Sequence, residues 1–73
     1  MIPSRALSLI RDRVAYIVSS NARTTGVPFL PPQSLEAMID QLVEEHGLVK
    51  AYARTMLIGM AANVSLDVVG DAG

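Results

Sequence analysis

Residues 48–62 read LVKAYARTMLIGMAA, a run in which Lys50, Arg54 and Thr55 are the polar residues. These residue types favour a helix, and that helix is apolar almost all the way round. A helix of this kind has to be covered on more than one side. The remainder of a 73-residue chain supplies at most one or two further helices. We therefore expect part of the cover to come from a second copy of the chain or from a partner protein.

Length and composition indicate a single helical domain, residues 1–73. A chain of 73 residues buries only about 60 to 65% of the surface of its unfolded form, so its stability on its own is marginal. It contains no cysteine, which excludes disulfides and thiolate metal sites. The apolar residues are mostly Ala, Val, Leu, Ile and Met, with two tyrosines and one phenylalanine, which favours helices over a β-sandwich. Oligomerisation is the remaining means of stabilising so small a chain.

The spacing of apolar residues predicts three helices, at about 4–21, 32–46 and 48–63. The second is the clearest, because its apolar residues follow the i, i+3, i+4, i+7, i+8 pattern of a buried helix face. Gly47 is placed to end that helix in a left-handed conformation, so that the chain turns sharply into the third helix. The predicted fold is all-α, a helical hairpin plus an N-terminal helix, completed by homodimerisation. The apolar positions are Leu7, Ile10, Val14 and Ile17 in the first helix and Leu35, Met38, Ile39, Leu42 and Val43 in the second.

Two segments are predicted to lie outside the helices. Residues 22–32 contain Gly26 and three prolines, which break helical hydrogen bonding. The apolar residues of this connector predict a strap across the helices rather than a free tether. The tail, residues 65–73, alternates briefly between apolar and polar residues, which allows either a short strand or a frayed coil.

The charges are separated along the chain, although the net charge is only -1. Four of the arginines lie in residues 1–31, whereas six of the acids lie in residues 32–73. This separation indicates either oppositely charged helices packed side by side or an arginine patch that docks an acidic partner. The near-neutral total gives no whole-protein attraction to nucleic acid or to an anionic membrane.

No targeting or membrane-spanning segment is recognisable. Residues 1–5 lack the basic start and the long apolar core of a signal peptide. The longest uncharged run of the third helix, residues 55–66, falls short of the roughly 20 residues that span a bilayer. We expect a cytoplasmic protein with no membrane partner.

Catalytic and metal-binding patterns are weak. His46 is the single histidine, so it has no second histidine at i+4 with which to bind a metal. Its position in the last turn of a helix is explained by the helix dipole, which favours a cationic residue there. The serines have no accompanying histidine and acid in a pattern typical of a nucleophile, and the glycines are too scattered for a phosphate loop. We expect no enzymatic activity, no cofactor and no metal.

Residues 42–57 resemble a helix-turn-helix in length and outline, which is the alternative prediction. In that case the chain is a small dimeric DNA-binding regulator whose second helix contacts DNA through Lys50, Tyr52 and Arg54. Several features oppose this interpretation. Val43 stands where such motifs want a small residue, His46 stands where they want an apolar one, and acidic residues lie close to the expected DNA surface.

The favoured prediction is a non-catalytic protein–protein interaction module. It describes a small regulator or inhibitor, of the phage or plasmid effector or adaptor type, that binds a larger host protein and blocks or bridges it sterically. Arginine and aromatic side chains dominate the energetics of interfaces. The predicted partner-binding residues are therefore Arg11, Arg13, Tyr16, Tyr52 and Arg54, and the predicted dimer interface consists of Met56, Gly59 and Met60.

Overall fold

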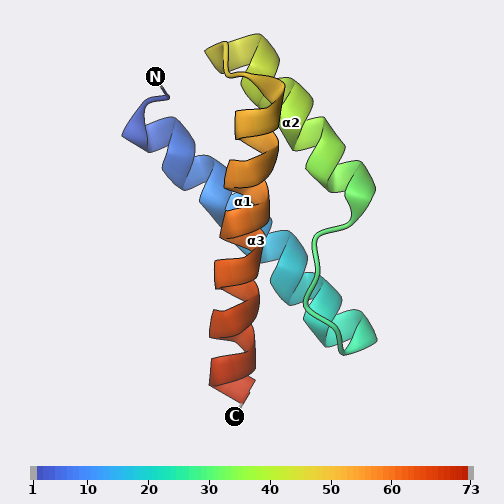
Figure 1. The fold of residues 1–73 in the computed structure, drawn as a ribbon. Coiled ribbons are helices and arrows are strands. Elements are labelled where there is room, and N and C mark those ends of the chain that lie inside the picture. The colour runs from blue at the N-terminus through green and yellow to red at the C-terminus, as the bar shows by residue number, and fades with distance from the viewer. Residues whose placement is uncertain (1, 73) are drawn as a thin grey trace.

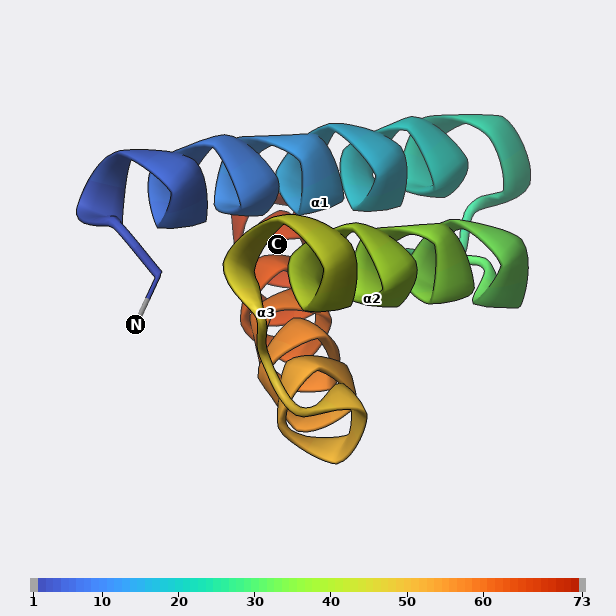
Figure 2. The same ribbon diagram turned by 90° about the horizontal axis from the view of Figure 1, so that it is seen from above.

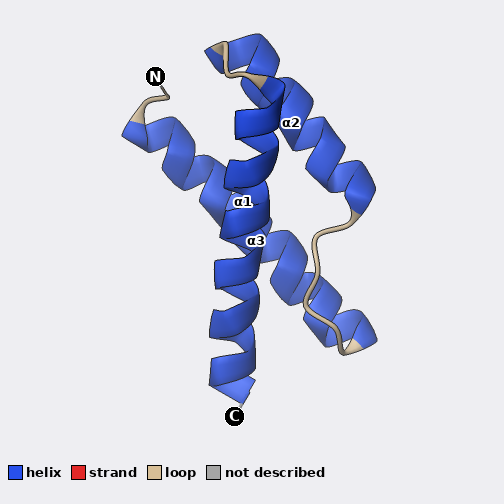
Figure 3. Cartoon of the chain, viewed as in Figure 1, coloured by secondary structure: helices blue, strands red, loops and turns tan. Residues whose placement is uncertain are grey.

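The computed structural model describes residues 2–72, and the side chains of residues 2–70. Over this range the chain forms three helices and no strand: α1 (Ser4–Thr25), α2 (Pro32–His46) and α3 (Lys50–Ala72) (Figures 1 and 3). The all-α prediction is confirmed for these residues. Homodimerisation stays a prediction.

The helices form two layers. Seen from above, α1 and α2 run in opposite directions, and α3 crosses both of them on one side (Figure 2). Both α1 and α2 pack against α3. The last helix of the chain therefore covers the apolar faces of the two helices that precede it.

The core contains three buried side chains from each helix. The apolar periodicity identified Ile10 and Val14 of α1 and all three buried residues of α2. It missed Val18, which is fully buried, whereas the predicted Leu7 and Ile17 are only partly buried. Leu57 and Ala53 are fully buried on the side of α3 that faces the other helices. The complete set is Ile10, Val14 and Val18 from α1, Met38, Ile39 and Leu42 from α2, and Ala53, Leu57 and Met60 from α3.

The first helix is longer than predicted, because residues 22–25 of the expected connector are helical. It ends at Gly26, which has a left-handed φ of 83° and donates its backbone N–H to the carbonyl of Ala22. The first proline after the helix is Pro28, so the chain is free to remain helical up to Thr25. The predicted boundary was wrong because the whole Gly/Pro-containing segment was assigned to the connector.

The remaining connector forms the predicted strap, defined here as residues 26–31. Asn21 Nδ2 donates to the carbonyl of Phe29 at 3.0 Å. The Ser65 hydroxyl, which has a single proton, lies 3.3 Å from the carbonyl of Pro28 and 2.8 Å from that of Ala61. The strap is thus tied to α1 and lies close to α3. Leu30 packs against the core, whereas Phe29 remains 41% exposed.

The second helix and the turn after it match the prediction. Gly47 has a φ of 66°, which is left-handed. Its N–H donates to the carbonyl of Val43 at 3.1 Å, and the N–H of Leu48 donates to that of Leu42 at 3.4 Å. The side chain of Leu48 then packs against the core. A glycine suits this position because residues with a Cβ rarely adopt a positive φ.

The third helix begins at Lys50, after the turn, and continues to Ala72. The prediction that residues 65–73 form a strand or frayed coil is therefore wrong for residues 65–72, and Gly73 lies outside the described residues. Proline is absent from this stretch, and the Ser65 hydroxyl donates within the helix to the carbonyl of Ala61 at 2.8 Å. Val64 lies one turn beyond Met60 and packs against the core. These contacts stabilise the helix in a segment whose valines, by their own propensity, favour a strand.

Candidate protein interaction surfaces

An exposed face of α1 presents Leu9, Arg13 and Tyr16. These residues lie four and three positions apart, so they share one side of the helix. Leu9 is 63% exposed and Tyr16 is 70% exposed. The structure therefore brings together two of the five predicted partner-binding residues, Arg13 and Tyr16, and adds Leu9, which the prediction missed.

Arg13 and Leu9 also line an open groove of about 380 Å³ between α1 and α2. No residue of α3 lines it. The groove has apolar residues from both helices, among them the core residues Ile10 and Met38. Its polar lining residues are Arg13 on α1 and Gln41, Glu45 and His46 on α2, so a cation and a carboxylate stand on opposite walls.

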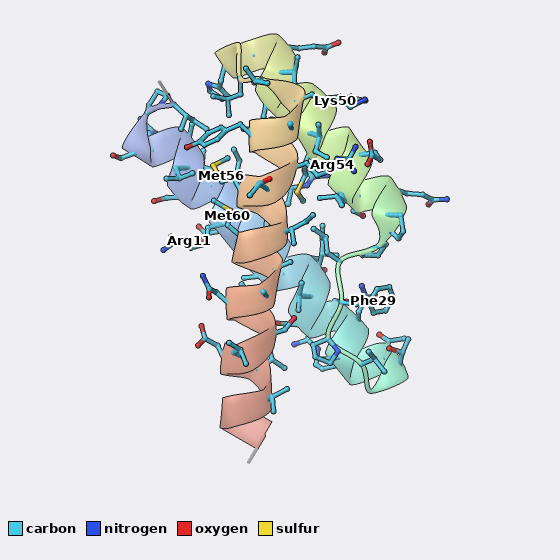
Figure 4. The ribbon with its side chains drawn as sticks, in the orientation of Figure 1. Arg11, Phe29, Lys50, Arg54, Met56 and Met60 are labelled. Atoms are coloured by element: carbon cyan, nitrogen blue, oxygen red, sulfur yellow. The ribbon has the colours of Figure 1, made fainter. Side chains whose placement is uncertain are left out.

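Arg11 lies on a different side of α1 from Arg13 and Tyr16. It lines a smaller hollow of about 170 Å³ that it shares with α3, where Met60, Asn63, Val64 and Asp67 form the rest of the wall. Arg11 is exposed there (Figure 4). Arg11 and Arg13, the two arginines of α1 that were predicted to bind a partner, therefore lie on separate surfaces.

Arg54 is occupied by a contact within the chain. Its Nη1 donates to Glu36 Oε2 at 2.7 Å and its Nη2 to Glu36 Oε1 at 3.3 Å, which is a two-pronged ion pair. This pair links α3 to α2, and both side chains remain nearly half exposed, at 41% and 47%. Both residues lie in residues 32–73, so this ion pair is not the predicted attraction between the arginines of residues 1–31 and the acids of residues 32–73.

The other residues of the predicted DNA-binding set lie at the start of α3. Lys50 and Tyr52 are both exposed, and Tyr52 is 60% exposed. In Figure 4, Lys50 and Arg54 lie on the side of α3 that faces α2. The ion pair with Glu36 leaves the Arg54 guanidinium less free to reach a phosphate than a solvated arginine would be.

The three residues predicted to form a dimer interface have different surroundings. Met60 is 8% exposed and belongs to the core of the single chain, and Met56 is partly buried against that core. Both lie on the other side of α3 from Arg54 (Figure 4). Gly59 is exposed, and a Cβ built on it would meet nothing within 4 Å. Of the three, Gly59 is the residue whose surroundings are open to a second copy.

The outward side of α3 carries a continuous exposed surface that we call the α3 stripe. Its residues recur at alternating intervals of three and four, the spacing with which a helix lines a seam against another helix. They lie opposite the buried face of Ala53, Leu57 and Met60. The stripe was not predicted from the sequence, because α3 is apolar on both sides and its last two turns were expected to be non-helical. The stripe consists of Tyr52, Thr55, Gly59, Ala62, Leu66 and Val69, all of them exposed.

The titratable residues do not gather into a metal site. Among the described residues, no three His, Asp or Glu side chains converge in a way that would hold a metal ion. His46 ends α2 and lines the groove beside Glu45. Within the described chain, no helix combines the length and apolarity needed to cross a membrane. Searches of protein-family models, curated proteins and solved structures found no match to this chain.

Proposed function

We propose that this chain is a non-catalytic protein–protein interaction module, a small cytoplasmic regulator or inhibitor that acts as a homodimer and blocks or bridges a larger protein sterically. The observation that carries this proposal is the outward side of α3. The α3 stripe there carries no charged side chain from Tyr52 to Val69, and Ile58 beside it and Leu66 within it are 52% and 70% exposed. A contiguous uncharged surface of this kind favours association with protein.

The larger partner binds, in this proposal, to the surface formed by α1 and α2. Arg13 and Tyr16 lie together there, and Arg13 lines the groove, whose walls carry both apolar and polar side chains. Arginine and tyrosine are enriched among the residues that dominate interface energetics. Tyr52 belongs to the α3 stripe, and Arg54 stabilises the contact between α2 and α3 through Glu36.

Affinity capture from a host lysate tests this assignment when variants are compared. The Arg13→Ala/Tyr16→Ala variant is expected to lose at least about 10-fold in retained partner relative to the wild type, because two interface anchors are removed. The matched control is Arg23→Ala/Thr24→Ala, an exposed pair near the other end of α1, which is expected to retain the same partner. Equal capture by both variants would show that the partner binds elsewhere. Failure of the wild type to retain any protein would contradict the binding function itself.

Fluorescence anisotropy with a random DNA duplex tests the alternative. A DNA-binding regulator has non-specific affinity with a Kd of about 10⁻⁴ to 10⁻⁶ M at physiological salt, and that affinity falls steeply as salt is raised. The proposed interaction module is expected to leave the anisotropy unchanged even at low salt. Salt-dependent binding that Lys50→Ala abolishes would replace the proposed function with the helix-turn-helix interpretation.

A further inference from the structure

The folded chain exposes more surface than its mass accounts for. Its solvent-accessible surface is 4947 Å², whereas a folded monomer of 7.8 kDa exposes about 4,400 Å². The excess of about 550 Å² approaches the roughly 600 Å² that each partner contributes to a small stable interface. The Cα radius of gyration, 12.4 Å, likewise exceeds the value of about 11 Å for a compact chain of this length. The chain is thus elongated, with extents of 38 × 23 × 15 Å, and has enough additional surface for one small interface.

The charges on the three helices identify the face that fits a second copy. In a two-fold dimer the same patch is used by both chains, so a charge at the centre of the patch meets its own copy. The exposed side of α1 is dominated by arginine and that of α2 by carboxylates, and each would repel itself. The α3 stripe carries no charge and meets no such repulsion. The exposed charged residues are Arg5, Arg11, Asp12, Arg13 and Arg23 on α1, Asp40, Glu44 and Glu45 on α2, and Lys50 and Asp67 on α3, both of which lie outside the stripe.

The arrangement of side-chain sizes along the stripe sets where two copies cross. From Tyr52 to Val69 the stripe is about 25 Å long. Large residues stand at its ends, whereas Gly59 and Ala62 lie in the middle, where nothing in the chain comes within 4 Å of a Cβ at Gly59. Small residues at the centre allow two helix backbones to approach closely. The large residues on either side then pack against the neighbouring helix.

We propose that two copies of this chain associate through the α3 stripe, with α3 of one copy crossing α3 of the other at Gly59 and Ala62. This inference rests on the proposed homodimer and specifies its surface. The interface lies opposite the core of each copy, so it leaves the grooves between α1 and α2 free on both subunits. The dimer accordingly presents two identical partner surfaces.

Light scattering after size-exclusion chromatography, over a series of protein concentrations, provides the first test. The wild type is expected to approach twice 7.8 kDa. Ala62→Glu is expected to weaken dimerisation at least about 100-fold, because it places two like charges at the crossing point. The matched control is Leu9→Glu, which adds the same charge at an exposed apolar position of α1 and is expected to leave the dimer intact. Circular dichroism verifies that both variants retain the helix content of the wild type.

The absence of cysteine from the chain allows a second test that does not depend on a disruptive substitution. Gly59→Cys is expected to form an intermolecular disulfide under mild oxidation, because backbones that cross at residue 59 bring the two Cα atoms within about 7 Å. Leu9→Cys, on α1, is expected to stay reduced under the same conditions.

The outcomes distinguish failure of the α3 interface from failure of the homodimer itself. A wild type that remains monomeric at the highest concentration would overturn both. A dimer that survives Ala62→Glu, or that cross-links at Leu9→Cys and not at Gly59→Cys, would overturn the α3 stripe and leave the homodimer standing. Masses that grow beyond the dimer and fall with added salt would also overturn it, because they indicate α1 of one copy on α2 of the next.

Discussion

The second and third helices are similar on their buried sides and differ in the chemistry of their exposed sides. Each contributes three side chains to the same core. Away from the core, α2 exposes Asp40, Glu44 and Glu45, whereas α3 exposes Tyr52, Ile58 and Leu66. The contrast shows that the outer side of α2 is suited to water, because it carries carboxylates. Packing within one chain satisfies only half of α3, and the other half is suited to contact with protein.

A charge on the buried side of α2 is expected to have the largest effect. Leu42 is fully buried, so Leu42→Asp places an unpaired carboxylate in the core and is expected to unfold the chain. Gln41→Asp, at the exposed neighbouring position, is expected to melt like the wild type. Thermal melts followed by circular dichroism measure both. A wild-type melting temperature for Leu42→Asp would mean that α2 packs through a different face.

Adjacent positions of α3 test its two sides directly. Leu57 is fully buried and Ile58 is 52% exposed. Leu57→Ala is expected to lower the free energy of unfolding by about 2 to 5 kcal/mol, because it leaves a cavity. Ile58→Ala is expected to change it by less than about 0.5 kcal/mol in dilute solution. Chemical denaturation at low protein concentration measures the difference. Equal losses would show that both sides of α3 are buried within one chain.

The left-handed turn between these helices is expected to have an intermediate effect. Gly47 adopts a φ of 66° with open space around it, so the cost of a side chain there is backbone strain and not a clash. Gly47→Ala is expected to lower the free energy of unfolding by about 1 kcal/mol. Gly47→Asn is expected to lower it less, since asparagine tolerates this conformation better. Urea titrations of the two variants provide the comparison, and equal losses would show that the strain is not the cause.

The ion pair between the two helices is expected to contribute least. Arg54 and Glu36 are 41% and 47% exposed, so water and salt screen their attraction. A double-mutant cycle with Arg54→Gln and Glu36→Gln is expected to give a coupling free energy below about 1 kcal/mol that decreases as salt is added. A larger coupling that salt does not change would show that the pair is shielded from solvent.

The elements that sequence predicted best are those with a signal at both ends and a single apolar face. The second helix has prolines before it, a regular apolar stripe and Gly47 after it, and its predicted boundaries were correct. The third has an apolar residue on nearly every side, so periodicity did not separate Met60, which enters the core, from Gly59, which does not. Its last turns were missed because contacts outside the helix, at Ser65 and Val64, are not visible in the local sequence.

The candidate site was predicted less well, because it depends on how the helices are oriented. Arg13 and Tyr16 were predicted as partner-binding residues from their residue types, and not as neighbours on one face of α1. The sequence did not indicate that Arg54 would pair with Glu36, eighteen residues earlier. Nor did it place the groove, whose walls come from α1 and α2. Such contacts follow from the crossing of helices and not from spacing within one helix.

The crossing of α3 over both earlier helices has a consequence for synthesis. Because α3 is the last of the three helices, the apolar faces of α1 and α2 have no partner within the chain until α3 has been made. Nascent chains that end near residue 49 are then expected to be molten and to attract chaperones. The native core is expected to form only once α3 is available to pack against both earlier helices.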